Sequence, residues 1–392
     1  MIARISILIF ALILLPDIYL YRAYLRTPAT KARRRRMLWL VPDALLCIYT
    51  AALCTCRDFA PQCQTWLFVY LFLLGVVAAP KFVFVLFALV GHAAERVFRP
   101  RHHIAAPLGI AFAVLTAAAA IWGGLIGPRQ FSVKRVEISF SDLPKEFDGY
   151  RIVHITDLHL GSLPHSIAAR AADSIAAIAP DAVVMTGDIQ NMQPSEIPPF
   201  YKELKRIKAK DGVFAVLGNH DYSMYINAPK DEKAANEART RSEEASMGWH
   251  LLLNGHLTLH RGTDSLVIAG AENEGRPPFP HKADMARTLH NVGPSAFVVM
   301  LQHDPWAWHH TILPRTKAQL TLSGHTHGGQ MSIFGLRPTM LKGSPDCGLY
   351  LDHSRALYVS SGLGGFVPFR LGLSPEMVVI TLRRAPSAQT QQ

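Results

Sequence analysis

The pattern of apolar and polar positions divides the chain into two parts. Four nearly uninterrupted apolar segments occupy the first third, and they fall at residues 5–25, 37–56, 66–90 and 104–126. A helix that crosses a bilayer needs about 20 mostly apolar residues, and each segment reaches that length. No small-residue cleavage site follows the first segment, so it is interpreted as a span and not as a signal peptide. We therefore predict an α-helical transmembrane region with about four helices over residues 1–127.

The pattern changes at residue 131, where short β-rich runs begin to alternate with helical stretches. The runs fall at residues 151–156, 182–186, 213–217, 266–269, 296–301, 320–322, 357–360 and 377–382. The helical stretches fall at residues 166–179, 195–210 and 231–247. Such alternation is typical of an α/β domain with a largely buried sheet. We divide this part into a linker and first strand region at 128–150, a folded domain at 151–384 and a disordered tail at 385–392.

The net charge of +11 belongs almost entirely to the apolar part. Residues 1–130 contain 14 Lys and Arg against 4 Asp and Glu, whereas residues 131–392 contain 26 against 25. The second part therefore lacks the basic excess that binds a phosphate backbone, and no nucleic-acid partner is expected. Basic residues gather at 27–36 and 91–103, and the positive-inside rule places both segments in the cytoplasm. With four spans, both termini and the whole second part then face the extracytoplasmic side.

Two polar features interrupt the apolar part. Lys81 lies within the third segment, and we expect its amine to snorkel toward the far interface of the bilayer. Cys47, Cys54, Cys56 and Cys63 also lie in this part, and no CxxC pair occurs. A disulfide from Cys63 to Cys54 or Cys56 stays open as an alternative. Small packing side chains are the better explanation.

Polar side chains follow five of the predicted strands at the point where each run ends. Asp157 and His159 follow the first run, and Gly-Asp, Gly-Asn-His-Asp, Gln-His-Asp and Gly-His-Thr-His-Gly-Gly follow four others. Ligands of open α/β sheets bind at the carboxyl ends of the strands. Each motif alone is compatible with an ordinary turn or helix cap. Packing does not select such residues at five strand ends, so we predict a binding site there.

The residue types at these strand ends favour a metal centre. Imidazole and carboxylate ligands together suit Mn, Fe or Zn, and not calcium. The candidate ligands outnumber those of one tetrahedral ion, so two ions are predicted. A two-metal site can hold the attacking and leaving oxygens of an in-line displacement. In SGHTHGGQ, we expect Gly324, Gly328 and Gly329 to let the backbone turn tightly beside the metals.

Together these motifs resemble the calcineurin-like metallophosphoesterase superfamily. ITDLHLG, GD, GNHD, His303 and SGHTHGGQ occur in the order and rough spacing of that family, over about residues 133–382. The pattern is similar to a membrane-attached subgroup of transmembrane metallophosphoesterase-domain proteins and UDP-2,3-diacylglucosamine pyrophosphatase-like phosphodiesterases. The resemblance implies a four-layer α/β/β/α sandwich. It also implies a multi-pass protein of the bacterial inner membrane.

The resemblance assigns a role to each motif residue. It implies a first metal held by Asp157, His159 and His327, a second held by Asn219, His303 and His325, and Asp188 as the bridging ligand.

The resemblance also implies the course of the reaction. A metal-bridging hydroxide attacks phosphorus in line, and His220 protonates the leaving oxygen, with Asp221 as its orienting partner. Relatives often carry an arginine where Ser361 stands here. Arg370 is therefore the candidate for binding the substrate phosphate, and an ordinary surface arginine is the alternative.

These expectations define a membrane-anchored, dinuclear metal-dependent phosphoesterase. Its substrate is expected to be a phosphodiester or pyrophosphate that is lipid-linked or close to the membrane, because four spans exceed what anchoring needs. A phosphodiesterase of soluble substrates is one alternative. A non-catalytic, metal-binding receptor or scaffold is another, although such a protein has no need of His220. A transporter is a weaker third alternative, and the sequence carries no signal for an oligomeric state.

Overall fold

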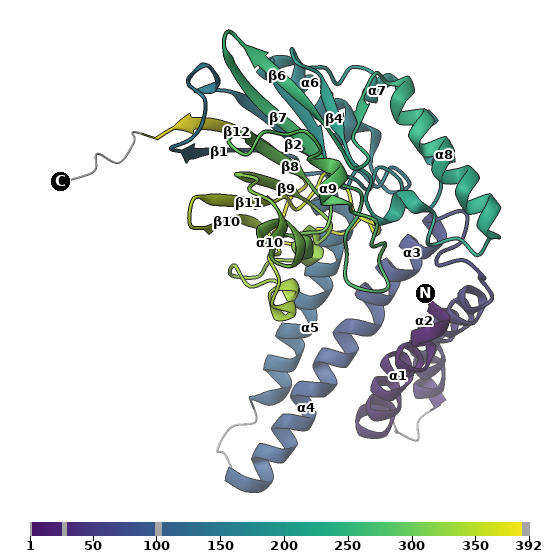
Figure 1. Ribbon diagram of the computed structural model, residues 1–392. Helices are drawn as coiled ribbons and strands as arrows, with labels where there is room; N and C mark the ends of the chain where they lie inside the picture. Colours follow the sequence, from purple (N-terminus) through teal and green to yellow (C-terminus); the bar gives the residue numbers. More distant parts are fainter. Residues whose placement is uncertain (1, 26–29, 99–103, 386–392) are drawn as a thin grey trace. The chain divides into compact units, whose positions relative to one another are not determined.

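The computed structural model describes residues 2–25, 30–98 and 104–385, and it divides into two compact units, Met1–Ile126 and Gly127–Gln392 (Figure 1). We refer to them as the helical unit and, after the family that the sequence resembles, the phosphoesterase unit. Parts of both basic segments, at 27–29 and 99–103, lie outside the described residues. So does nearly all of the predicted disordered tail, at 386–392.

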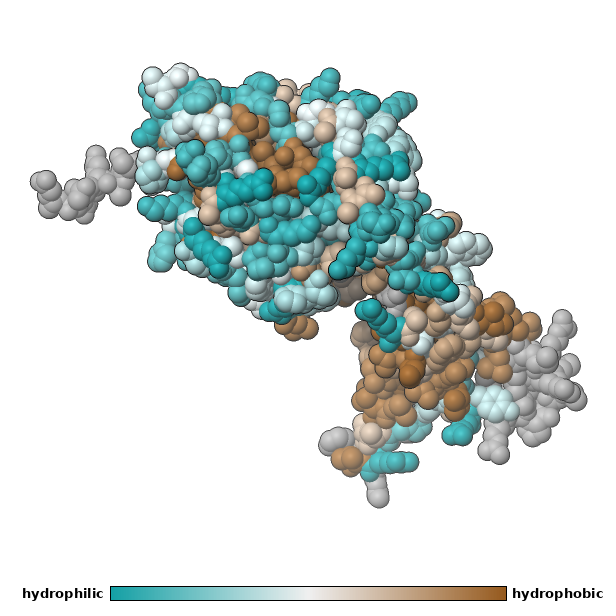
Figure 2. All heavy atoms as spheres, turned by 45° about the vertical axis from the view of Figure 1, so that its right-hand side comes forward, coloured by the Kyte–Doolittle hydropathy of each residue, from teal (hydrophilic) through white to brown (hydrophobic). Residues whose placement is uncertain are grey.

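The helical unit consists of apolar helices. Three helical stretches are long and apolar enough to cross a membrane, namely Ile2–Tyr24, Thr65–Ala94 and Ala105–Arg129, and the apolar part of a fourth helix, Leu38–Cys54, is shorter. Figure 2 shows the apolar surface of this unit in brown. Its cysteines are free thiols. The helices are α1 (Ile2–Leu20), α2 (Thr30–Cys54), α3 (Thr65–Leu73), α4 (Ala79–Phe98) and α5 (Ala105–Ile121), with π-helical turns at Tyr21–Leu25, Leu74–Ala78 and Trp122–Ile126.

Lys81 pairs with carboxylates inside the helical unit, so the expectation that it snorkels is wrong. Its Nζ atom lies 3.0 Å from Asp17 Oδ1 and also forms an ion pair with Asp43. The two aspartates are only 4 % and 2 % exposed. The indole N–H of Trp39 donates a second hydrogen bond to Asp17, over 3.1 Å. A buried ammonium is stabilised by a nearby countercharge, and helices α1 and α2 supply two.

The phosphoesterase unit contains two six-stranded mixed sheets. The first has the order β1-β12-β2-β3-β4-β5, in which β2 to β5 are parallel. The second has the order β10-β11-β9-β8-β7-β6, in which β7, β8, β9 and β11 are parallel. The strands are β1 (Ser132–Phe140), β2 (Arg151–Ile155), β3 (Ala182–Met185), β4 (Val213–Ala215), β5 (His250–Leu251), β6 (Gly255–Arg261), β7 (Asp264–Gly270), β8 (Phe297–Leu301), β9 (Leu320–Ser323), β10 (Gly348–Asp352), β11 (Arg355–Val359) and β12 (Glu376–Arg384).

The sheets pack face to face, and helices cover their outer faces. Phe214 of the first sheet and Val299 of the second belong to one buried cluster between the sheets. Helix α6 (His165–Ile178) packs on the outer face of the first sheet. The α/β/β/α architecture expected from the resemblance is therefore confirmed. The remaining helices are α7 (Tyr201–Leu204), α8 (Lys230–Ser246), α9 (Met285–Thr288) and α10 (Leu313–Arg315).

The prediction of one helix over residues 195–210 is wrong. Short 3-10 turns at Pro194–Glu196 and Pro198–Phe200 precede the single turn of α7. Proline lacks the N–H group and clashes with the preceding turn, so this proline-rich stretch does not form a continuous helix. The sequence prediction also missed the edge strands β5, β6 and β10.

Candidate metal centre

The predicted ligands converge because their strands run in parallel. Strands β2, β3 and β4 are neighbours in the first sheet, and β8 and β9 are neighbours in the second. Their carboxyl ends therefore open toward the same region of the domain. Five of the seven predicted ligands have left-handed backbone angles, which are uncommon for residues other than glycine and concentrate at functional sites. These φ values are 52° at Asp157, 48° at His159, 58° at Asp188, 71° at His325 and 51° at His327.

The first group of predicted ligands consists of Asp157, His159 and His327. The Nε2 atoms of the two histidines are 3.2 Å apart. Asp157 Oδ1 lies 3.5 Å from His327 Nε2 and 4.0 Å from His159 Nε2. The carboxylate and His159 are fully buried. Three ligand atoms thus face one another at distances that one metal ion can span.

A second group gathers around Asp188 and Asn219. Asp188 Oδ2 and Asn219 Oδ1 each lie 3.2 Å from His303 Nε2. Asn219 Oδ1 also lies 2.8 Å from His325 Nδ1. Asp188 Oδ2 is 3.6 Å from His159 Nε2, which belongs to the first group. Asp188 therefore lies between the two groups, where a bridging ligand is needed.

The hydrogen bonds around His303 leave room for one positive charge, carried by a proton on Nε2 or by a metal ion. Its Nδ1 atom lies 2.7 Å from the Thr186 carbonyl, which accepts a hydrogen bond and cannot donate one. In a neutral ring the bare Nε2 lone pair then faces Asp188 Oδ2 and Asn219 Oδ1, both of which are acceptors. The amide nitrogen of Asn219 donates to the Tyr225 hydroxyl over 2.7 Å, which fixes the amide oxygen toward the histidines. A cation among these atoms removes the mismatch, so the residues fit a metal.

Electrostatics also favour a positive charge beside Asp188. Burial lowers the pKa of His303, but the adjacent Asp188 carboxylate outweighs it and raises that pKa to about 10. Burial lowers the pKa of His159 to about 3 and raises the pKa of Asp157 above its usual range. The Asp188 carboxylate therefore favours a positive charge at His303, whereas burial shifts the pKa of His159 and of Asp157 toward their neutral forms.

Glycines allow the backbone of the His-Thr-His segment to approach the ligands. A Cβ atom on Gly324 would lie 2.1 Å from Asp157 Oδ2, so no side chain fits there. Gly328 and Gly329 have φ values of 56° and 67°. These are left-handed angles that glycine adopts without steric cost. The expected tight turn is confirmed.

His220 is held by its own backbone neighbours. Its Nδ1 atom lies 2.5 Å from the Asn191 carbonyl, so Nδ1 carries a proton and Nε2 is left for chemistry. The ring stacks on Tyr225 with 4.1 Å between ring centroids, and it meets the His159 ring edge-on at 4.6 Å. Burial lowers the pKa of His220 below its usual value, and the opposing effect of Asp188 offsets only part of the shift.

Asp221 binds backbone amides, and the partner of the His220 ring is Asn191. The Asp221 carboxylate accepts hydrogen bonds from the N–H groups of Gly218 and Asp188, both over 2.8 Å, and of Ile189 over 3.0 Å. The carboxylate thereby ties the turn after β3 to the turn after β4. In this arrangement Asp221 positions the loop that carries Asp188, in place of the expected orienting role toward His220.

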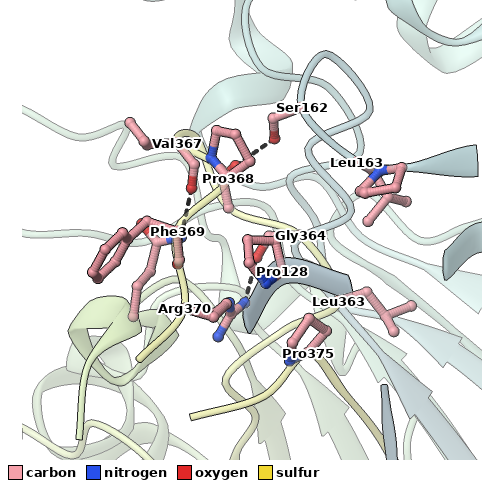
Figure 3. A pocket seen from close by; sticks show the side chains of 13 residues that line it. Pro128, Ser162, Leu163, Leu363, Gly364, Val367, Pro368, Phe369, Arg370 and Pro375 are labelled. Carbon is pink, nitrogen blue, oxygen red and sulfur yellow. Dashed lines mark hydrogen bonds between the residues drawn. The ribbon is translucent and has the colours of Figure 1, made fainter. Parts of the chain in front are cut away.

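Arg370 is 2 % exposed, so the alternative of a surface arginine is wrong. Its Nη2 group donates to the carbonyls of Ser361 over 2.8 Å and Gly362 over 3.1 Å, and also to Gly364 (Figure 3). The N–H of Gly364 in turn donates to the Asp157 carbonyl over 2.7 Å. Arg370 thus braces the loop beside a metal ligand, and its binding of substrate phosphate stays a prediction.

Several residues of the site were missed by the sequence analysis. Asp304 Oδ2 lies 3.5 Å from His325 Nε2, and its position directly after His303 was a usable signal. Tyr225 lies four residues beyond Asp221, with nothing in its type to mark it. The carbonyls of Thr186 and Asn191 act through the backbone, so no residue type reveals them.

A four-layer sandwich with two groups of histidine and carboxylate ligands at its strand ends has the architecture of the metallophosphoesterases. Residues 150–329 match the family described as Calcineurin-like phosphoesterase. Residues 3–128 match the family described as Probable Calcineurin-like phosphoesterase, transmembrane domain. The chain thus carries a calcineurin-like phosphoesterase domain that is preceded by a transmembrane phosphoesterase domain.

The chain is similar to membrane-associated relatives. It is 29% identical over 282 residues to "Transmembrane protein with metallophosphoesterase domain" of Danio rerio, and the alignment covers 69% of this chain and 62% of that protein. It is 29% identical over 331 residues to "UDP-2,3-diacylglucosamine pyrophosphatase LpxG" of Chlamydia trachomatis serovar D, and the alignment covers 70% of this chain and 97% of that protein. The solved structure of Phosphopantetheinyl Hydrolase (PptH) from Mycobacterium tuberculosis aligns with a TM-score of 0.35 and 14% identity, over 54% of this chain and 88% of that chain. The chain therefore spans less than two thirds of the length of the Danio rerio relative.

Proposed function

We propose that this protein is a membrane-anchored metallophosphoesterase that hydrolyses a phosphodiester or pyrophosphate bond at a dinuclear metal centre. The observation that carries the proposal is the placement of Asp188 between two groups of ligand atoms. When bound, two Mn, Fe or Zn ions supply Lewis acidity toward phosphoryl oxygens and lower the pKa of water. The first ion would be held by Asp157, His159 and His327, the second by Asn219, His303 and His325, and both by Asp188.

The remaining residues orient groups and move a proton. In its doubly protonated form, His220 donates the Nε2 proton to the leaving oxygen, while the Nδ1 proton stays bonded to the Asn191 carbonyl. Asp221 and Arg370 act as positioning residues through the backbone of the metal loops. Asn219 contributes a neutral ligand, which limits the negative charge that an anionic substrate meets.

We further propose that the substrate is lipid-linked or presented at the membrane. The apolar helices support this assignment, as does the printed name of the Chlamydia trachomatis relative, a pyrophosphatase of a diacylated sugar nucleotide. We place the phosphoesterase unit on the extracytoplasmic side of a bacterial inner membrane, on the basis of the two basic segments at 27–36 and 91–103.

The test is a hydrolysis panel on the full-length protein in detergent, supplied with Mn²⁺, Fe²⁺ or Zn²⁺. Bis-p-nitrophenyl phosphate and a glycolipid pyrophosphate serve as the soluble and the lipid substrate. We expect turnover that is lost in Asp188→Asn and is faster for the glycolipid. Activity retained in Asp188→Asn contradicts the two-metal assignment, and equal turnover of both substrates contradicts the lipid preference. A metal-loaded protein that hydrolyses neither substrate favours the receptor or scaffold alternative.

A further inference from the structure

A segment of the phosphoesterase unit presents apolar side chains to the outside. Phe334, Leu336 and Leu341 are 101 %, 70 % and 92 % exposed, and Ile333 and Met340 are about half exposed. We call these five side chains the apolar patch. Large exposed apolar side chains that gather in one segment mark a surface that another partner covers.

The polar residues of the same segment point inward. Asp346 is 3 % exposed and accepts hydrogen bonds from Arg337 Nε over 2.7 Å and Arg337 Nη2 over 3.0 Å. The hydroxyls of Thr339 and Tyr350 add bonds to the same carboxylate over 2.8 Å and 2.9 Å. This arrangement is the reverse of an ordinary surface loop. The bonds to Asp346 hold the apolar patch in place on the outside.

The apolar patch also lies close to the point where the chain leaves its last apolar helix. The helical stretch Ala105–Arg129 ends within the phosphoesterase unit, which begins at Gly127. Gly127 packs so tightly on Arg370 that a Cβ atom would lie 1.9 Å from the Arg370 carbonyl oxygen. Pro128 and Arg370 line one small cavity of about 10 Å³ (Figure 3).

From Arg370 the contacts continue directly to the apolar patch. The N–H of Ser332 donates to the Leu371 carbonyl over 2.8 Å, and Met331 forms a β-bridge with Leu371. Ile333, the first residue of the patch, follows at once. The exit of the last apolar helix and the apolar patch are therefore joined by contacts within one unit.

The charge of the segment suits a lipid surface. The charge of Arg337 is balanced by Asp346, so Lys342 is the charged residue of 331–346 that has no countercharge within this stretch. Lys342 is exposed beside Leu341. An exposed basic residue next to exposed apolar ones favours the anionic surface of a membrane. The metal ligands His325 and His327 precede the patch by only a few residues.

We propose that the apolar patch inserts into the bilayer surface next to the last membrane span. The insertion holds the metal centre close to the lipid headgroups, where a phosphate on a membrane lipid can reach it without leaving the bilayer. The consequence for substrates rests on the proposed phosphoesterase function, whereas the insertion does not depend on it.

Fluorescence of an added tryptophan tests the insertion directly. Phe334→Trp and a control, Thr263→Trp, are prepared in the full chain and reconstituted into phosphatidylcholine–phosphatidylglycerol vesicles. Thr263 is exposed in the turn between β6 and β7, at the opposite end of the strands from the metal ligands. After the emission of the unsubstituted protein is subtracted, Phe334→Trp should be blue-shifted and quenched by brominated phosphatidylcholine about twofold more than Thr263→Trp. Equal quenching of the two variants overturns the proposal. A blue shift without quenching also overturns it, since a second copy or another protein then covers the patch.

A kinetic test addresses the consequence for substrates. The double variant Phe334→Ser/Leu341→Ser is compared with Leu257→Ser, which removes an exposed leucine from β6. We expect the double variant to raise the KM for a vesicle-borne glycolipid pyrophosphate roughly tenfold, because two large side chains lose their contact with lipid. Hydrolysis of soluble bis-p-nitrophenyl phosphate should stay unchanged. An unaltered KM for the vesicle substrate speaks against the inference. If the unsubstituted protein hydrolyses neither substrate, the proposed function fails, and the quenching result still decides whether the patch inserts.

Discussion

Both units of the protein bury two aspartates close together, but they compensate the charges differently. In the helical unit, Asp17 and Asp43 share Lys81, a cation supplied by the chain itself. In the phosphoesterase unit, the ion pairs of Asp157 and Asp188 among the described residues are with histidines. The first cluster has its cation built in. The second consists of groups that become good ligands when they lose their protons.

The difference lies in what a lysine and an imidazole can do. An ammonium has three donors and no lone pair, so it compensates a carboxylate but cannot bind a metal. A neutral imidazole has one lone pair, and in His303 the Thr186 carbonyl directs that lone pair toward Asp188. The lysine cluster therefore carries a fixed cation, whereas the histidine cluster is suited to hold an exchangeable one. Each prediction below changes one side of this contrast.

The largest effect is expected for Asp188→Asn in the phosphoesterase unit. The change removes the carboxylate between the two ligand groups and leaves the shape of the side chain. We expect turnover to fall about a thousand-fold or more, since the metals contribute several kcal/mol to transition-state stabilisation. Metal analysis of the purified protein should show fewer than two ions per chain. Two ions retained with full turnover would falsify the bridging role.

His220→Gln separates proton donation from metal binding. The glutamine keeps a polar side chain but cannot transfer a proton, so turnover should fall by roughly 10²- to 10⁴-fold. The metal content should equal that of the unsubstituted protein, because His220 is not among the proposed ligands. Loss of an ion in His220→Gln means that the ring binds metal, and our assignment of its role is then wrong. A substrate with a better leaving group should recover part of the loss.

Lys81→Met tests the opposite side of the contrast. It leaves Asp17 and Asp43 buried without their cation, and the breaking of a buried ion pair costs about 3–5 kcal/mol. Thermal unfolding in detergent should shift to lower temperature. The triple change Lys81→Met/Asp17→Asn/Asp43→Asn removes all three charges and should recover most of the loss. A triple variant as unstable as the single one indicates that the cluster does more than pair charges.

Arg370→Gln tests whether an arginine can act on the metal centre through the backbone. The change removes the three hydrogen bonds to the loop that contacts Asp157, and loss of such supporting interactions weakens metal affinity about 10- to 100-fold. Metal titration of the apoprotein measures this directly. If affinity is unchanged and only the KM for substrate rises, Arg370 binds the substrate phosphate as the sequence suggested.

The sequence predicts the ligands better than it predicts their supports. Residues such as Asp157 and His303 could be found because they end parallel strands, and the ends of parallel strands meet at one edge. The partners of Lys81 could not be found, since Asp17 and Asp43 lie on other helices and only the packing of the helices brings them together. The same holds for Arg370, whose acceptors are backbone carbonyls without a residue signature.

Local chemistry also limited the prediction of elements. Prolines divide residues 195–210 although the stretch looks helical by charge. The apolar patch at 333–341 escaped notice because its apolar residues have neither a strand period nor a helix period. Its exposure depends on the inward turn of Arg337 and Thr339 toward Asp346, which is a property of the folded chain.

The smallest effect concerns Asp346, a buried carboxylate outside the membrane helices that is compensated by an arginine. Burial raises its pKa, but hydrogen bonds from Arg337, Thr339 and Tyr350 outweigh burial and hold the pKa below its usual range. A lowered pKa stabilises the fold at pH values above the unfolded value of about 3.9, and the stabilisation is lost as the pH falls through the folded value. Asp346→Asn should therefore lower the free energy of unfolding at pH 7 by about 1 kcal/mol or less. The difference from the unsubstituted protein should shrink as the pH is lowered from about 5 to about 3. Denaturant unfolding at each pH measures it. A difference that stays constant with pH shows that the side chain contributes through packing and not through its charge.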